Sequence, residues 1–119
     1  MVTPPIIVVD GQDVWFHESE KAVSHHFEPS YLTDTNKLAF ESTGRRVELV
    51  VERRTIPRRW LPDRTDERVG VRLLDEEPTH ADELASVLRE HLERAGLSTH
   101  GSETLKALLD RAIERSGYT

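Results

Sequence analysis

The sequence predicts an α+β fold, a two-layer sandwich in which an antiparallel sheet of four to five strands carries helices on one face. Two observations support this prediction. Short segments of alternating apolar residues follow one another through tight turns, and three further segments place apolar residues at helical spacing. The expected order is β-β-α-β-β-β-α-α. One domain spanning residues 1–119 is expected, because a chain of this length is too short for two independent cores.

The N-terminal segment predicts a β-hairpin. Residues 5–9 and 13–17 are rich in β-branched and aromatic side chains, and they flank Asp10 and Gly11. Glycine accepts the positive φ that a tight turn requires. Trp15 and Phe16 are neighbours in the second strand, so one of them must point away from the main core. A sheet covered on one face alone would therefore expose an aromatic side chain.

A short helix should follow, capped by Ser19 and limited to about two turns by Pro29. Its apolar face is formed by Ala22, Val23, His26 and Phe27. Tyr31 and Leu32 are expected to continue this apolar surface, and residues 34–36 are expected to form a turn.

The centre of the chain predicts three more strands. Residues 37–41 and 45–53 alternate in polarity across a short turn and should pair antiparallel, and residues 69–74 resume the alternation. The intervening residues 54–68 contain two prolines and show no period. They are therefore expected to form a long loop, and loops of this length are often functional or mobile.

Two amphipathic helices are expected at the C-terminus, at residues 79–95 and 103–116. Thr79 with Asp82 resembles a capping box, and Gly96 followed by Leu97 is typical of a Schellman ending. Ser102 precedes the last helix and Gly117 should end it. The short linker favours an antiparallel helix pair. Docking of the final helix on another subunit is the alternative.

Charge is distributed unevenly along the chain. The formal net charge is −6, but residues 45–68 hold eight arginines and five acids, about +3, which leaves about −9 for the remainder. Arginine outnumbers lysine 13 to 3, which codon bias in a GC-rich genome would also produce. No apolar run approaches 18 residues, so no membrane span is expected. The N-terminus lacks a signal-peptide pattern, and we expect a cytoplasmic protein.

The sequence contains no motif that indicates catalysis or cofactor binding. Cysteine is absent, which excludes disulfides, thiolate ligands and a cysteine nucleophile. No Gly-x-Ser-x-Gly elbow or glycine-rich phosphate loop is present. The six histidines lack the helical spacing of metal ligands, and we interpret them as surface residues, with His26 and His91 at the edges of apolar stripes. We therefore expect no catalytic residue, no metal and no cofactor. A small hydrolase or metal enzyme built around His17, His25 and His26 is the disfavoured alternative.

The candidate partner-binding residues gather between positions 53 and 64. They are Arg53, Arg54, Arg58, Arg59, Trp60 and Arg64. An aromatic side chain among arginines is typical of protein interfaces, which favours a non-catalytic module that binds another protein or forms a homo-oligomer. The same residues suit single-stranded nucleic acid or phosphate. The acids Asp63, Asp66 and Glu67 and the acidic remainder of the chain argue against that alternative. In a third interpretation, Trp60 tucks under the loop as a satellite core residue.

The N-terminal third resembles small uncharacterised actinobacterial α+β proteins. The resemblance covers residues 6–14, 19–23 and 27–29, which in those proteins form an opening hairpin and a short helix ending near Glu-Pro. It includes no catalytic motif and implies no activity. Small acidic α+β proteins of this kind are also similar in general appearance to the immunity proteins of bacterial toxin systems. An immunity- or inhibitor-like role, with an acidic surface covering a basic toxin, is one form of the protein-binding hypothesis.

Overall fold

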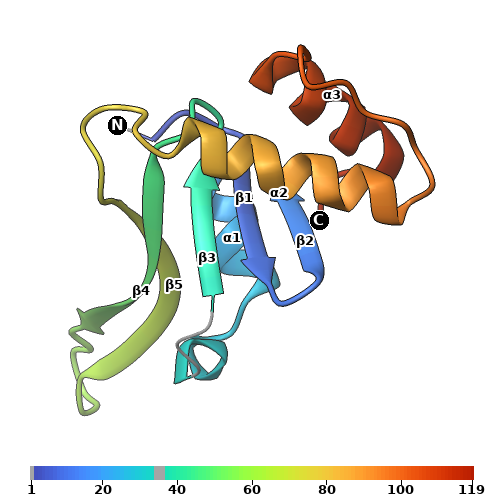
Figure 1. Cartoon of the computed structure of the whole chain (residues 1–119). Helices are drawn as coiled ribbons and strands as arrows, with labels where there is room; N and C mark the ends of the chain where they lie inside the picture. Colours follow the sequence, from blue (N-terminus) through green and yellow to red (C-terminus); the bar gives the residue numbers. More distant parts are fainter. Residues whose placement is uncertain (1, 34–36) are drawn as a thin grey trace.

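A five-stranded antiparallel sheet forms the centre of the computed structural model, which describes residues 2–33 and 37–119 (Figure 1). The elements in chain order are β1 (Ile6–Asp10), β2 (Asp13–His17), α1 (Glu20–His26), the 3₁₀ helix η1 (Pro29–Thr33), β3 (Lys37–Glu41), β4 (Arg46–Ile56), β5 (Arg64–Leu73), α2 (Ala81–Arg94) and α3 (Leu105–Ser116). The strand order is β2-β1-β3-β4-β5. The predicted class and element order are confirmed. The turn expected at residues 34–36 lies outside the described residues.

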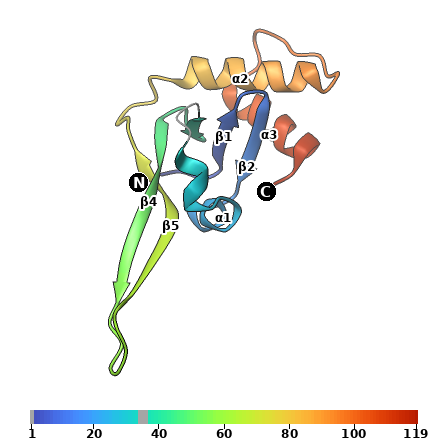
Figure 2. The same ribbon diagram turned by 90° about the horizontal axis from the view of Figure 1, so that it is seen from below.

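Helices cover both faces of the sheet, so the prediction of helices on one face is wrong. One core cluster joins Ile7, Phe16 and Phe40 to α2 and α3, and a second joins Ile6 and Val8 to α1. Figure 2 shows α2 and α1 on opposite sides of the strands. The physical reason lies in β1, because four consecutive β-branched residues bury side chains on both faces and require cover on both.

Trp15 points to the α1 side, where it is half-buried rather than exposed. Its ring meets those of His26, Phe27 and Tyr31 edge-on, at centroid distances of 5.5, 5.7 and 6.4 Å. Phe16 lies on the other face and is fully buried against α2. The expectation of an exposed aromatic on β2 is therefore wrong, because α1 and η1 fill the second face.

Helix ends follow the sequence signals in three of four cases. Ser19 Oγ accepts a hydrogen bond from the Ala22 N–H, as predicted. Gly96, at φ 83°, ends α2 with the Leu97 N–H donating to the Leu92 carbonyl, which is the Schellman pattern. Gly117, at φ 73°, ends α3 as predicted.

The predicted cap at the start of α2 is wrong. His80 occupies the N-cap position of α2 without a side-chain cap, and Thr104 rather than Ser102 caps α3. Near α2, the Asp75 carboxylate instead accepts hydrogen bonds from the Arg46 N–H and from the imidazole of His80. These contacts tie the β5–α2 connection back to β4 and so fix where α2 begins.

The long loop expected at residues 54–68 is a β-hairpin. β4 and β5 stay in register over ten pairs, from Val47↔Leu73 to Ile56↔Arg64, and leave a connection of residues 57–63. Pro57 and Pro62 lie just outside the strands, where the missing N–H costs no ladder hydrogen bond. We call the part of this hairpin that extends beyond the sheet, residues 52–68, the arm.

The arm gives the molecule an elongated shape. The chain measures 62 × 29 × 23 Å, with a radius of gyration of 16.4 Å, whereas a compact chain of this length has one of about 13.5 Å. Both ribbon views show the arm extending away from the helices (Figures 1 and 2). The arm therefore exposes surface that core packing does not require.

Candidate functional site

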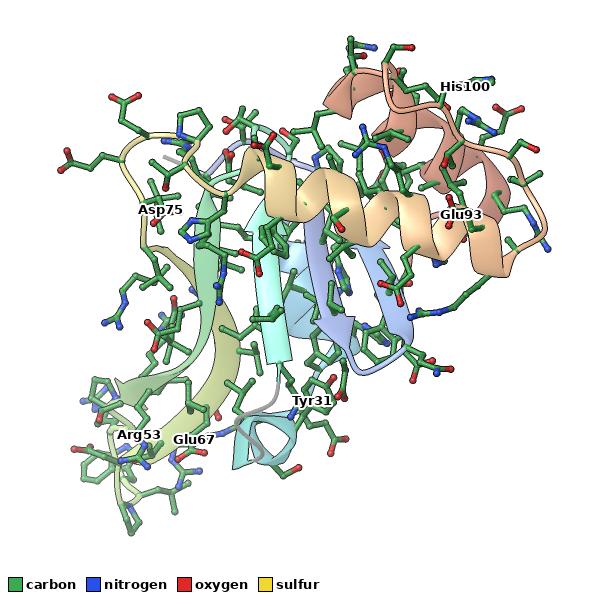
Figure 3. The ribbon with its side chains drawn as sticks, in the orientation of Figure 1. Tyr31, Arg53, Glu67, Asp75, Glu93 and His100 are labelled. Carbon is green, nitrogen blue, oxygen red and sulfur yellow. The ribbon has the colours of Figure 1, made fainter. Side chains whose placement is uncertain are left out.

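Cross-strand ion pairs fix the arm along its length. Arg53 Nε lies 3.0 Å from Glu67 Oε1, and Arg68 Nε lies 2.9 Å from Glu52 Oε2 (Figure 3). Each pair is largely exposed, so each adds little to stability. These pairs specify the register of the two strands. Opposite charges face each other at successive paired positions, and a shifted register would place like charges opposite each other.

The tip of the arm exposes two large apolar side chains. Trp60 is 84% exposed and Leu61 is 60% exposed, so the interpretation of Trp60 as a satellite core residue is wrong. The Arg59 guanidinium lies 5.2 Å from the centroid of the Trp60 ring, and Arg58 Nε donates to the Pro62 carbonyl at 2.9 Å. The tip thus combines an aromatic surface with two positioned guanidinium groups.

The six predicted site residues all lie on the arm, but they divide into two groups. Arg53 is paired with Glu67, and Arg64 with Asp66. Within residues 2–33 and 37–119, no carboxylate forms an ion pair with Arg54, Arg58 or Arg59. The unneutralised positive charge is therefore concentrated near Trp60, on a chain whose remainder is strongly acidic.

Buried His17 and half-buried His26 form a pair that the sequence did not predict. His17 Nε2 lies 2.9 Å from His26 Nδ1, and His17 is fully buried with its Nδ1 atom lacking a hydrogen-bond partner among the described residues. Burial, together with the nearby His26, lowers the pKa of His17 to about 4. Burial also lowers the pKa of His26. The expectation that the histidines lie at the surface is wrong for His17, because β2 is covered on both faces.

The described part of the chain contains no cluster of three or more His, Cys, Asp or Glu side chains arranged to hold a metal ion. A hollow of about 480 Å³ lies between α1 and β5, lined in part by Ser24, His25 and Arg68. Ser24 donates its hydroxyl hydrogen bond to the Lys21 carbonyl, so no imidazole activates it. Ser116 Oγ lies 2.9 Å from His91 Nε2, and no carboxylate of the described residues bonds that imidazole. A triad needs such an orienting group.

A buried carboxylate organises the turn between β3 and β4. Glu41 is fully buried and accepts hydrogen bonds from the Thr3 N–H at 3.0 Å, the Thr43 N–H at 2.9 Å and the Arg45 guanidinium at 2.9 Å. Burial opposes its ionisation, but the hydrogen bonds from Arg45, Thr43 and Thr3 outweigh burial and lower the pKa of Glu41 to about 2. Glu41 thus joins the turn after β3 to the N-terminal segment at Thr3, which indicates a structural role.

Comparison with protein-family models, curated proteins and solved structures finds no match to this chain. No helix among the described residues is long and apolar enough to cross a membrane.

Proposed function

We propose that the chain is a non-catalytic protein-binding module that contacts its partner with the tip of the β4–β5 arm. The observation that carries the proposal is the exposure of Trp60 and Leu61, at 84% and 60%, at the tip of a projecting β-hairpin. Tryptophan and arginine are the residue types most enriched at the energetic centres of protein interfaces. The arm holds both together where a partner reaches them without rearrangement of the core.

The charges favour a particular kind of partner. Arg54, Arg58 and Arg59 surround the apolar tip without carboxylate partners among the described residues, so the complementary surface is an acidic protein surface with an apolar hollow for Trp60. An immunity-like role, in which the acidic body covers a basic toxin, would instead use another face of this chain.

Affinity capture from a lysate of the source cells, quantified by mass spectrometry, tests the proposal. A partner should be retained by the wild-type chain and reduced at least about tenfold by Trp60→Ala, as expected for an interface anchor. Tyr118→Ala is the matched control, because Tyr118 is an aromatic residue that is 50% exposed outside the arm. Equal capture by wild type and Trp60→Ala, or no capture by a chain that sediments as a monomer, would refute the proposal.

Nucleic-acid binding is the second candidate, because exposed Trp60 lies near arginines that form no ion pair with any described residue. Three phosphate contacts from Arg54, Arg58 and Arg59 predict a log–log salt slope of about −2 for a single-stranded oligonucleotide. Fluorescence anisotropy titrations at salt concentrations from about 50 to 200 mM measure this slope. Absent or salt-independent binding eliminates this candidate and leaves the protein-binding proposal intact.

A further inference from the structure

β3 and β4 separate after only two paired positions. Ala39 pairs with Val47 and Phe40 with Arg46, yet β4 continues to Ile56. Beyond Val47, β4 therefore has β5 as its only paired neighbour in the described chain. We call the opening between β3 and β4 the fork (Figure 1). Its lining includes Leu32, Ala39, Arg46, Val47, Leu49 and Leu74.

The backbone of β4 directs into the fork hydrogen-bonding groups that no described strand pairs. The Leu74 N–H donates to the Arg46 carbonyl at 2.9 Å, so the polar groups of Arg46 face β5. Residues of an antiparallel strand alternate in the direction of these groups. Leu49, Val51 and Arg53 therefore direct their N–H and C=O groups away from β5, and β3 has no paired residue opposite them.

The hollow in the fork lies in the plane of the sheet. It has a volume of about 260 Å³ and is lined from both faces. Ala39 and Leu49 belong to the cluster on the α1 side, whereas the Arg46 guanidinium lies over Phe40 on the α2 side, 5.5 Å from the ring centroid. A hollow bounded by both faces occupies the position of an additional strand.

Charges at the two ends of the fork define what fits it. Glu48 and Glu52 are neutralised by Arg72 and Arg68 on β5. Arg46 at the closed end has a buried Nε without a hydrogen-bond partner among the described residues, and Arg54 at the open end has no carboxylate partner there. Between these cations the edge of β4 is apolar at Leu49 and Val51. An extended segment that is apolar in the middle and acidic at its ends is complementary to this edge.

We propose that the fork binds an extended segment of a partner protein, which adds to β4 as a strand. Main-chain hydrogen bonds to Leu49, Val51 and Arg53 hold the segment, one apolar side chain fills the hollow, and acidic side chains meet Arg46 and Arg54. This is strand addition to an exposed sheet edge. The inference rests on the proposed function, because strand addition would be the way in which the chain binds its protein partner close to the tip of the arm.

A library of random decapeptides displayed on phage, selected against the immobilised full chain, supplies the probe. Enriched peptides should alternate apolar with other residues and contain Asp or Glu. Amide hydrogen exchange measured by NMR with the synthesised peptide should slow at least about tenfold at Leu49, Val51 and Arg53. The amides of Thr65 and Glu67, on the outer edge of β5, should not change. An empty selection, or protection on β5 instead, would overturn the inference.

Proline substitutions give a matched pair of variants. Val51→Pro removes an N–H that faces the fork, and Thr65→Pro removes one that faces solvent from the opposite edge of the arm. Both positions tolerate proline because neither N–H belongs to the β4–β5 ladder. The selected peptide should bind Thr65→Pro as it binds wild type and should bind Val51→Pro at least about tenfold more weakly. Equal binding by both variants contradicts strand addition.

Two further variants keep the inference testable and separate it from the proposed function. If Val51→Pro fails to fold, the double variant Arg46→Gln, Arg54→Gln should weaken peptide binding, and unchanged binding would overturn the inference. Trp60→Ala should leave peptide binding intact while reducing partner capture at least about tenfold. Partner capture that depends on Trp60 but proceeds without peptide binding in the fork would therefore refute strand addition and leave the proposed function standing.

Discussion

Acidification should destabilise the fold well before its carboxylates titrate, because His17 must be neutral in the folded chain. The side chain is fully buried, its Nδ1 has no hydrogen-bond partner among the described residues, and its Nε2 lies 2.9 Å from His26 Nδ1. A second proton on His17 would place a positive charge in the core beside His26. Burial, then the nearby His26, lowers the pKa of His17 from 6.5 to about 4.

The sign and size of the effect follow from proton linkage. Between pH 6.5 and 4 the unfolded chain binds more protons at His17 than the folded chain, so stability rises with pH through this window and is fully present above it. The pKa difference corresponds to about 3 kcal/mol in total. At pH 5 about 2 kcal/mol of this stability is already lost relative to neutral pH.

Urea unfolding at about pH 7.5, 6, 5 and 4.5 measures the loss of stability directly, because proton linkage predicts the change over this pH range. With a denaturant slope of about 1.5 kcal/mol/M, the midpoint should fall by about 1.3 M between neutral pH and pH 5. His17→Phe should remove most of this dependence. His25→Gln, which changes an exposed histidine on α1, should retain it. A pH-independent midpoint, or an equal slope in His17→Phe, would refute the assignment of a neutral buried imidazole.

Three substitutions test other parts of the structure. Glu41→Gln should destabilise the chain by about 3 kcal/mol at neutral pH in urea titrations, and the difference from wild type should shrink as pH falls from 4.5 towards 2, because protonation removes the same carboxylate. Gly44→Ala should cost at least about 2 kcal/mol, because φ is +95° and the new Cβ would lie 2.4 Å from Ala81 Cα; an unchanged melting temperature would contradict this. Trp60→Ala should change stability by less than about 0.5 kcal/mol in the same assay, and a larger loss would show that the tip packs on the body.

The sequence predicted the elements whose signals are local. The hairpin around Gly11, the cap at Ser19 and the ending at Gly96 depend on a few neighbouring residues, so the pattern and the structure agree. The antiparallel sheet also followed from short connections. What failed was the layer arrangement, although the run Ile6–Asp10 contained the signal: an uninterrupted apolar strand is buried on both faces.

The arm escaped prediction because its strands lack an apolar alternation. Arg53, Arg54 and Glu67 lie at paired positions, but a charged two-stranded ribbon buries nothing, and hydrophobic periodicity cannot detect it. Complementary charges across the strands were the available signal, and it becomes readable only once the register is known. The candidate site residues nevertheless lie together on the arm, since an aromatic among arginines is visible without any knowledge of backbone conformation. Their role in partner binding stays a prediction.

The exposed tip and the fork have one structural cause: β4 and β5 extend beyond the other strands of the sheet. Exposed strand edges invite association with other chains, and proteins protect them with charge. The outer edge of β5 follows this rule along the arm, with Glu67 among its outward-facing residues. The inner edge of β4 departs from it at Leu49 and Val51, which are apolar where the edge first becomes free. At the corresponding position of the β5 edge, Val69 is buried in the cluster on the α1 side. Leu49 and Val51 border a hollow instead and the described core buries neither fully, so a strand that binds there would cover apolar residues that the fold leaves open.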